Sequence, residues 1–173
     1  LEGLALYYRL TGDPDALEAV ARMCDWLAQD VAATVPGDFP TVREAGVSLW
    51  MLSVGYEVFP DRHYLLEIME PHARAMLELQ HEDGSWDPYI KADWALHRHP
   101  RYRKTLHLYN LAMGLMRYAQ VSKDPRVAPA LHRFLRHALV DGDLLLPGGR
   151  ALFYENAFAI ERELGDLNMS GAR

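Results

Sequence analysis

The sequence has little cysteine: Cys24 is alone among 173 residues. A single thiol excludes an intrachain disulfide framework and a cysteine-rich metal site, and it leaves the cellular compartment open. Long hydrophobic runs are also lacking. The longest uncharged stretch on an apolar helix, Ala45 to Tyr56, falls well short of the ~20 residues that cross a bilayer. We therefore expect no membrane partner.

Basic residues are in short supply as well. Lys and Arg total 18 against 24 Asp and Glu, which gives a formal net charge of −6. Nucleic-acid binding depends on an excess of basic side chains, so we expect no nucleic-acid partner. Half of the residues are hydrophobic, and the length suits one domain with a substantial core.

What the chain does contain is apolar periodicity of the helical kind, with no convincing strand pattern. The spacing predicts an all-α fold of seven helices, at about 2–11, 15–34, 42–58, 62–80, 103–121, 126–139 and 151–164. Asp, Thr and Pro recur between these segments, where Asp or Thr caps the next helix and Pro fits its first turn. The turns are expected near Asp13, Asp61, Asp124 and Asp166, and they predict helical hairpins.

The predicted helices are of two alternating kinds. The first, third, fifth and seventh are apolar around most of their circumference, which is typical of helices buried on several sides. The others are amphipathic: in the second, Leu17, Val20 and Cys24 share one face. Pro71 is expected to kink the fourth helix. We therefore expect inner helices alternating with outer ones.

One stretch carries a recognisable pattern. Leu77-Glu-Leu-Gln80-His-Glu-Asp83-Gly84-Ser85-Trp86 ends a helix, turns at Gly84 and places a Trp that can fold back over the last helical turn. The pattern L-x-x-Q-x-x-D-G-S-W resembles the hairpin signature of the α/α-toroid superfamily, which includes six-hairpin glycosidases, related lyases and epimerases, and terpene cyclases.

The resemblance implies a ring of six hairpins, whereas seven helices make three and a half. We therefore expect either a single all-α domain over residues 1–173 or about half of a larger α/α toroid. The partner would then be the rest of the toroid or a self-associated copy. The chain carries no D-x-D-D motif of the squalene type of cyclase, and Cys24 alone serves a cysteine-containing zinc site poorly. Carbohydrate-active members of the superfamily remain.

In a ring of hairpins, the loops that lead from outer to inner helices gather at one end. These segments are 36–44, 86–110 and 141–155. Glu44 and Glu155 stand near the starts of inner helices, and glycoside hydrolysis usually needs two carboxyl groups. They are the candidate acid and base, with Arg43 as a substrate or ion-pair residue. The alternative is that each Glu only complements the dipole of its helix.

The segment from 86 to 110 is rich in aromatic and basic residues. Between 91 and 107, five positive charges face one negative charge. Aromatic faces stack on sugar rings, and Arg and His donate to carboxylates, which points to an anionic sugar such as a uronic acid. The alternative is a solvated basic loop. The candidate substrate-binding residues are Trp86, Tyr89, Trp94, His97, Arg103, Asn110 and Arg43.

His107 and Tyr109, near the start of the fifth helix, are candidate proton-transfer residues. The alternative for both is partly buried packing with satisfied polar tips. His97 and His99 have metal-ligating side chains but no clear third ligand, so we expect no metal and no cofactor.

The function expected from the resemblance is that of a carbohydrate-active enzyme of the six-hairpin type. A glycoside hydrolase on an oligo- or polysaccharide that contains uronic acid is the first hypothesis. The alternatives are a polysaccharide lyase or sugar epimerase, and a non-catalytic helical-hairpin binding or scaffold domain. Localisation stays open.

Overall fold

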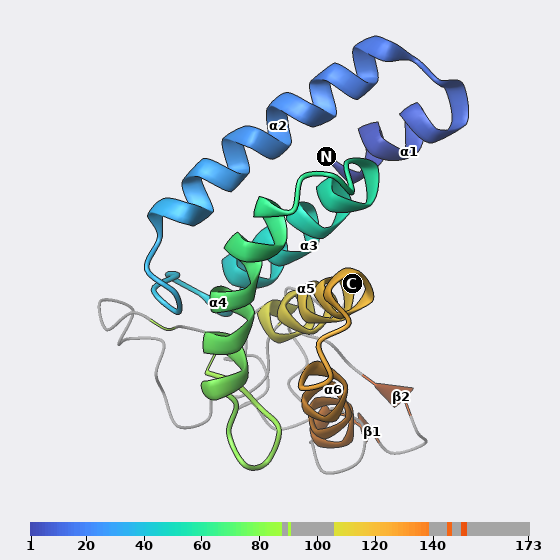
Figure 1. Cartoon of the computed structure of the whole chain (residues 1–173). Coiled ribbons are helices and arrows are strands. Elements are labelled where there is room, and N and C mark those ends of the chain that lie inside the picture. Colours follow the sequence, from blue (N-terminus) through green and yellow to red (C-terminus); the bar gives the residue numbers. More distant parts are fainter. Residues whose placement is uncertain (88–89, 91–105, 139–144, 147–149, 152–173) are drawn as a thin grey trace.

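A computed structural model describes residues 1–87, 90, 106–138, 145–146 and 150–151 (Figure 1). Apart from two two-residue strands, all the regular secondary structure of the described residues is helical, which confirms the all-α class of helical hairpins. Six of the predicted helices are present within one to three residues of their expected ends. They are α1 (Glu2–Thr11), α2 (Pro14–Ala33), α3 (Val42–Val58), α4 (Tyr64–Glu78), α5 (Leu106–Ser122) and α6 (Val127–Arg136).

Two short strands were missed by the sequence pattern. β1 (Leu145–Leu146) pairs antiparallel with β2 (Arg150–Ala151), with Leu145 opposite Ala151. The expectation that a seventh helix begins at residue 151 is therefore wrong at that residue, and the remainder of that predicted helix lies outside the described residues. A two-residue ladder is too short to produce alternation in a sequence.

The helix start follows the expected chemistry at the first turn. The Asp13 carboxylate accepts a hydrogen bond from the Asp15 amide at 3.0 Å, and Pro14 occupies the first position of α2. Before α6, the Asp124 carboxylate accepts from the Arg126 amide at 2.9 Å, but the cap residue of α6 is Arg126, which makes no side-chain cap bond. The expected cap at Asp61 is wrong: α4 is preceded by His63, which makes no side-chain cap bond.

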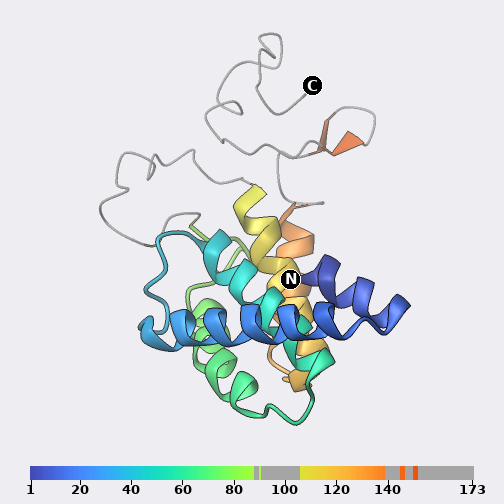
Figure 2. The ribbon, with the colours of Figure 1, turned by 90° about the horizontal axis from the view of Figure 1, so that it is seen from above.

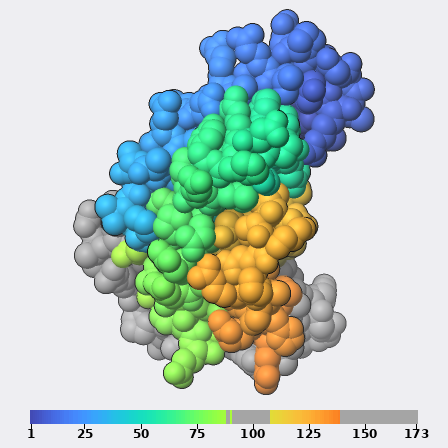
Figure 3. Space-filling model, in the orientation of Figure 1, coloured from blue at the N-terminus to red at the C-terminus, as the bar shows by residue number. Residues whose placement is uncertain are grey.

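The helices pair as three hairpins, α1 with α2, α3 with α4 and α5 with α6, joined in sequence order (Figures 1 and 2). The hairpins follow one another across one face of the molecule, from blue through green to orange (Figure 3). Between hairpins, α3 packs most extensively against α5 and also touches α1. The odd-numbered helices are thus in contact with one another, as expected for inner helices.

The contact between α3 and α5 depends on two glycines. A Cβ atom added to Gly46 would collide with the backbone of Asn110 and Leu111, and one added to Gly114 would collide with the backbone of Gly46. Both glycines are buried. The two helix backbones therefore touch directly, at a separation that only residues without side chains permit.

The main core is formed largely by side chains of α2, α3, α4 and α5 that pack against one another. Leu52, Leu65 and Leu111 are among its fully buried side chains. Cys24 is also buried, and a Cβ atom added to Gly55 of α3 would collide with its Sγ atom. Burial raises the pKa of the Cys24 thiol to about 11. This thiol is therefore protonated at neutral pH and serves as a packing group.

The first helix differs from its expected role. Of its residues only Ala5 is buried, while Leu6 and Leu10 are 56% and 76% exposed. The prediction of burial on several sides is wrong for α1 in the described structure. The physical reason is that α1 packs mainly against α2 and α3, so its outer face has no described helix packed against it.

A histidine is buried where α4 meets α2. His72 is 2% exposed, and its Nε2 atom lies 3.1 Å from the Val31 carbonyl oxygen. Its ring also contacts Phe39, with centroids 5.2 Å apart. Burial lowers the pKa of His72, and the hydrogen bond to Val31 opposes this change. The ring is therefore held neutral in the folded protein.

We predict that Gly46→Ala and Gly114→Ala each destabilise the fold by about 1–3 kcal/mol or more, because the backbones of α3 and α5 must separate to admit a methyl group. Gly3→Ala is the matched control: it lies on an exposed face of α1 with open space around it, and should stabilise by up to ~1 kcal/mol. Urea unfolding checks both. Equal effects at Gly3 and Gly46 would contradict the proposed crossing.

We predict that the free energy of unfolding decreases as pH falls below about 6.5, the usual His value in an unfolded chain. The folded pKa of His72 is lower, so unfolding takes up a proton and acid favours the unfolded chain. Above that pH the effect is absent. Urea unfolding between about pH 5 and pH 8 measures it. His72→Gln should flatten this part of the profile, whereas the exposed His132→Gln should leave it unchanged.

Candidate functional site

A groove of about 700 Å³ lies where the end of α2, the segment 34–41 and the start of α3 meet. We call it the cap groove. Its first wall comes from α2 and its second from the opening turns of α3. It coincides with the first of the three segments that the sequence placed at the cleft. Its polar and aromatic lining includes Asp30, Asp38, Phe39, Arg43, Glu44 and Ser48.

Glu44 lines this groove and also closes the start of α3. Its Oε2 atom accepts hydrogen bonds from the Thr41 amide at 2.7 Å and from the Thr41 hydroxyl at 2.6 Å. The Thr41 hydroxyl accepts in turn from the Glu44 amide at 3.4 Å, which completes a capping box. Glu44 therefore has a structural role at the start of α3, and this role is a capping box that the sequence analysis did not predict. Both bonds to the carboxylate use one of its oxygens.

The starts of α3 and α5 lie side by side. Gly46 packs against the backbone of Asn110, so the first turn of α5 stands next to the first turns of α3. Tyr109 is 45% exposed and Asn110 is partly buried. His107 belongs to the same turn of α5, and its side chain lies outside what the structure describes. The expectation that these helix starts meet is confirmed for α3 and α5.

A backbone hydrogen bond adds the second cleft segment to this end. The Ile90 amide donates to the Pro40 carbonyl oxygen at 3.1 Å. The chain that leaves the turn at Trp86 is thereby tied to the loop that precedes α3. Segments 36–44 and 86–90, which are far apart in sequence, therefore meet beside the cap groove.

Trp86 does not have the role expected of it. The residue is 1% exposed, its indole N–H donates to the Met76 carbonyl oxygen at 2.7 Å, and its ring packs 5.6 Å from that of Phe134. The prediction of Trp86 as a substrate-binding platform is wrong, because no face of the ring is open to a ligand. The expectation that it folds back over the end of its helix is confirmed.

The rest of that motif fixes the turn. Gln80 donates to the Gly84 carbonyl oxygen at 3.0 Å and to the Ala130 carbonyl oxygen of α6 at 2.9 Å. Gly84 has a φ of 90° and packs so closely on α6 that a Cβ atom would collide with the Arg133 backbone. The motif therefore attaches the end of α4 to α6.

The acid of the motif is held in its charged form. Burial would raise the pKa of Asp83, but hydrogen bonds from the Ser85 amide and hydroxyl, with His137 and His81 nearby, bring it below its usual range. The Ser85 hydroxyl bonds to Asp83 at 2.6 Å. This hydroxyl donates to a carboxylate instead of a His base, so the group does not form a nucleophilic triad.

Glu2 is an acid in the first turn of α1, as Glu44 is in the first turn of α3. Its carboxylate lies 2.7 Å from Arg117 of α5, and the other terminal nitrogen of Arg117 lies 3.6 Å from Glu57 at the end of α3. Arg9 of α1 pairs with Glu57 at 3.0 Å. Glu2 is therefore at the opposite end of α3 from Glu44, in a network that joins three helices.

Several predicted site residues fall outside the described residues. Among the catalytic candidates this applies to Glu155. Among the substrate-binding candidates it applies to Tyr89, Trp94, His97 and Arg103. Of the remaining candidates, Arg43 and Glu44 line the cap groove, and Tyr109 and Asn110 stand on the adjoining turn of α5.

Two acids of the groove were missed by reasoning from sequence. Asp38 lies in the loop before α3, and Asp30 lies near the end of α2. Asp38 lies inside segment 36–44, which the sequence analysis placed at the cleft. That placement could have identified Asp38 as a candidate. Asp30 is on an outer helix, and only the position of α2 beside α3 brings it to the groove.

Within the residues that the structure describes, no three His, Cys, Asp or Glu side chains form a group that could hold a metal ion. None of the described helices has the length and apolar character needed to cross a membrane.

Comparison of the chain with protein-family models, with curated proteins and with solved structures gives no significant match.

Proposed function

We propose that the chain is a carbohydrate-active protein of the α/α-toroid type, and that the cap groove is part of its sugar-binding site. The observation that supports this most is that the start of α3 lines the groove, while Asn110 of α5 packs against Gly46 of α3 and the Ile90 amide bonds to Pro40 in the groove wall. Their sequence positions are widely separated. The N-terminal ends of two helices favour a negatively charged ligand there.

The proposed reaction is glycoside hydrolysis. Glu44 is the acid or base on the α3 side, because its carboxylate lines the groove while one oxygen holds it in place against Thr41. The partner carboxylate is Glu155 or Asp38, of which Asp38 lines the same groove. In such a pair one carboxylic acid protonates the leaving oxygen. The other carboxylate either removes a proton from an attacking water or, at the shorter separation, attacks the sugar carbon to form a covalent intermediate that water then hydrolyses.

The proposed substrate contains uronic acid. Arg43 lines the groove beside Glu44, and a guanidinium group binds a carboxylate through two parallel hydrogen bonds. The basic and aromatic residues between 91 and 107 follow the Ile90 attachment point in sequence, and they would extend the contacts with an anionic chain.

A lyase or epimerase is the second candidate function. It is favoured by Tyr109, which is 45% exposed on the turn of α5 that packs beside the start of α3. A phenol or imidazole at that position would transfer the proton next to the uronate carboxyl group, with His107 as the other proton-transfer residue and Asn110 holding the carboxylate. A binding or scaffold domain without catalysis is the remaining alternative.

We predict that Glu44→Gln reduces hydrolysis by about 10²–10⁴-fold, the usual contribution of a general acid or base. The assay follows release of reducing ends from polygalacturonate, alginate and hyaluronan. Gln preserves a capping box, so the midpoint of thermal unfolding should stay unchanged. Glu44→Ala should lose both activity and stability. Glu67→Gln, at an exposed first-turn acid of α4 that does not line the groove, is the matched control and should retain activity.

The same assay separates the candidates. A lyase would release an unsaturated uronate that absorbs ultraviolet light. If this absorbance is lost in Tyr109→Phe and retained in Glu44→Gln, the reaction is that of a lyase and not hydrolysis. Full hydrolytic activity in Glu44→Gln would refute the proposed role of this carboxylate. Binding of the polymers without product would leave only the non-catalytic alternative.

A further inference from the structure

Residues 34–41, which we call the joining segment, connect α2 to α3 and supply part of the lining of the cap groove. Phe39 anchors this segment in the main core, where it is 6% exposed, and it also borders the groove. The Pro40 carbonyl oxygen accepts from the Ile90 amide at 3.1 Å. The shape of the groove therefore depends on what holds Phe39 in place.

His72 of α4 is the side chain that packs behind this segment. Its ring lies 5.2 Å from that of Phe39, measured between centroids. Its Nε2 atom lies 3.1 Å from the Val31 carbonyl oxygen in the last turn of α2, and the same oxygen accepts from the Thr34 amide at 3.0 Å. Because a carbonyl oxygen can only accept, the neutral ring carries its proton on Nε2. His72 thus connects α4 to the end of α2 and to the joining segment.

The other nitrogen of the His72 ring is left over in this arrangement. Nδ1 is buried and has no hydrogen-bond partner among the described residues. Protonation would place an N–H donor and a positive charge at that position. A buried donor without an acceptor is costly, and a buried charge without a partner is more costly still. The closed arrangement therefore accepts only the neutral ring.

Charged side chains of the surrounding elements do not offset this cost. Burial is the main cause of the lowered pKa of His72, and the opposing influence is the bond to the Val31 carbonyl oxygen. Glu70 of α4 is paired with Arg74 and Arg126, and Arg117 of α5 is paired with Glu2. The other charged residues on nearby parts of these elements are exposed to solvent, namely Asp30, Asp38, Arg43, Glu44, Glu67 and Glu78.

We propose that the joining segment is a pH-sensitive wall of the cap groove, in which protonation of His72 displaces Phe39 and opens the groove. Phe39 contacts the His72 ring and borders the groove, so its departure connects that ring to the solvent in the groove. A solvated His has an ordinary pKa of about 6.5. Opening therefore takes up a proton, and acid below that pH favours the open segment.

The segment can leave without the unfolding of the helices on either side. It contains no helical residue, and Gly37 provides a left-handed φ of 83° in its middle. Thr41 and Glu44 close the start of α3 through bonds to each other, so the cap of α3 does not depend on Phe39. Loops that border a binding groove commonly open at a lower free energy than the core.

The test is hydrogen exchange of single amides, followed by NMR and expressed as protection factors, which correct for the pH dependence of intrinsic exchange. The Thr34 and Ile90 amides report on the segment, because their acceptors are the Val31 and Pro40 carbonyl oxygens. We expect their protection to fall by up to about 30-fold from pH 8 to pH 5, the factor by which a solvated His gains protons.

Urea distinguishes local opening from global unfolding. Low concentrations of urea should leave the exchange of the Thr34 and Ile90 amides nearly unchanged at each pH, because a local opening exposes little surface. The same concentrations should accelerate the exchange of the Leu111 and Leu115 amides in the buried part of α5, which need global unfolding.

His72→Gln is the decisive variant. Its amide can still donate to the Val31 carbonyl oxygen but does not titrate, so protection of the Ile90 amide should no longer depend on pH. His132→Gln, at an exposed position of α6, is the matched control and should retain the full dependence. In the unmodified protein, the ring resonances of His72 should titrate over the same pH range as the loss of protection.

Three results would overturn the proposal. One is protection of the Thr34 and Ile90 amides that stays constant between pH 8 and pH 5. Another is an equal urea dependence for the Ile90 and Leu111 amides, since the segment would then open only when the whole chain unfolds. The third is an unchanged pH dependence in His72→Gln. No sugar takes part in these measurements, so they fail or succeed independently of the proposed function.

Discussion

The close crossing of α3 and α5 is the constraint on which the rest of the structure depends. Gly46 and Gly114 allow the two backbones to touch, and any side chain at either position would push the helices apart. Because α3 also contacts α1 and α4, its position relative to α5 sets the relation between all three hairpins. It also places Asn110 beside the start of α3, next to the cap groove.

The two ends of α3 then acquire different chemistry. At its start, Thr41 and Glu44 close the helix and the cap groove opens between α2 and α3. At its end, Glu57 is paired with Arg9 and Arg117, which ties α1 and α5 to the same helix. The charges at the end thus join helices to one another, while those at the start line a groove. This asymmetry is why the start of α3 is the site proposed for a ligand.

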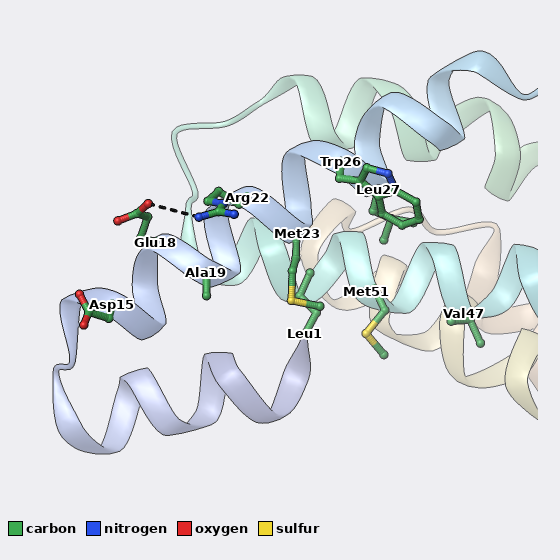
Figure 4. Close-up of a pocket in the computed structure, with 10 residues that line it drawn as sticks. All are labelled: Leu1, Asp15, Glu18, Ala19, Arg22, Met23, Trp26, Leu27, Val47 and Met51. Atoms are coloured by element: carbon green, nitrogen blue, oxygen red, sulfur yellow. Dashed lines mark ion pairs between the residues drawn. The ribbon is translucent and has the colours of Figure 1, made fainter.

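Two grooves border α2 and α3, and they share Val47 as a lining residue. The groove that contains Met23, Trp26 and Met51 has a mostly apolar lining (Figure 4). The cap groove carries Asp30, Asp38, Glu44 and Arg43, so it suits a polar ligand.

The L-x-x-Q-x-x-D-G-S-W pattern predicted the local structure of its turn, but it did not predict that the turn would join α4 to α6. Its residues predicted the end of a helix, a left-handed glycine and a Trp folded back on the helix, and the bonds of Gln80, Gly84 and Trp86 confirm this. Those features depend on neighbours within ten residues. The attachment of Gln80 to Ala130 does not, and it is what makes the motif a link between hairpins.

The sequence by itself determined the all-α class, the positions of six helices and the cap at Asp13, because each of these depends on residues a few positions apart. Only the tertiary structure decided that Trp86 is buried, that Asp30 reaches the cap groove and that α1 is exposed. The physical reason is that burial depends on which helices pack together. That packing depends here on the contact between Gly46 and Gly114, which are 68 positions apart.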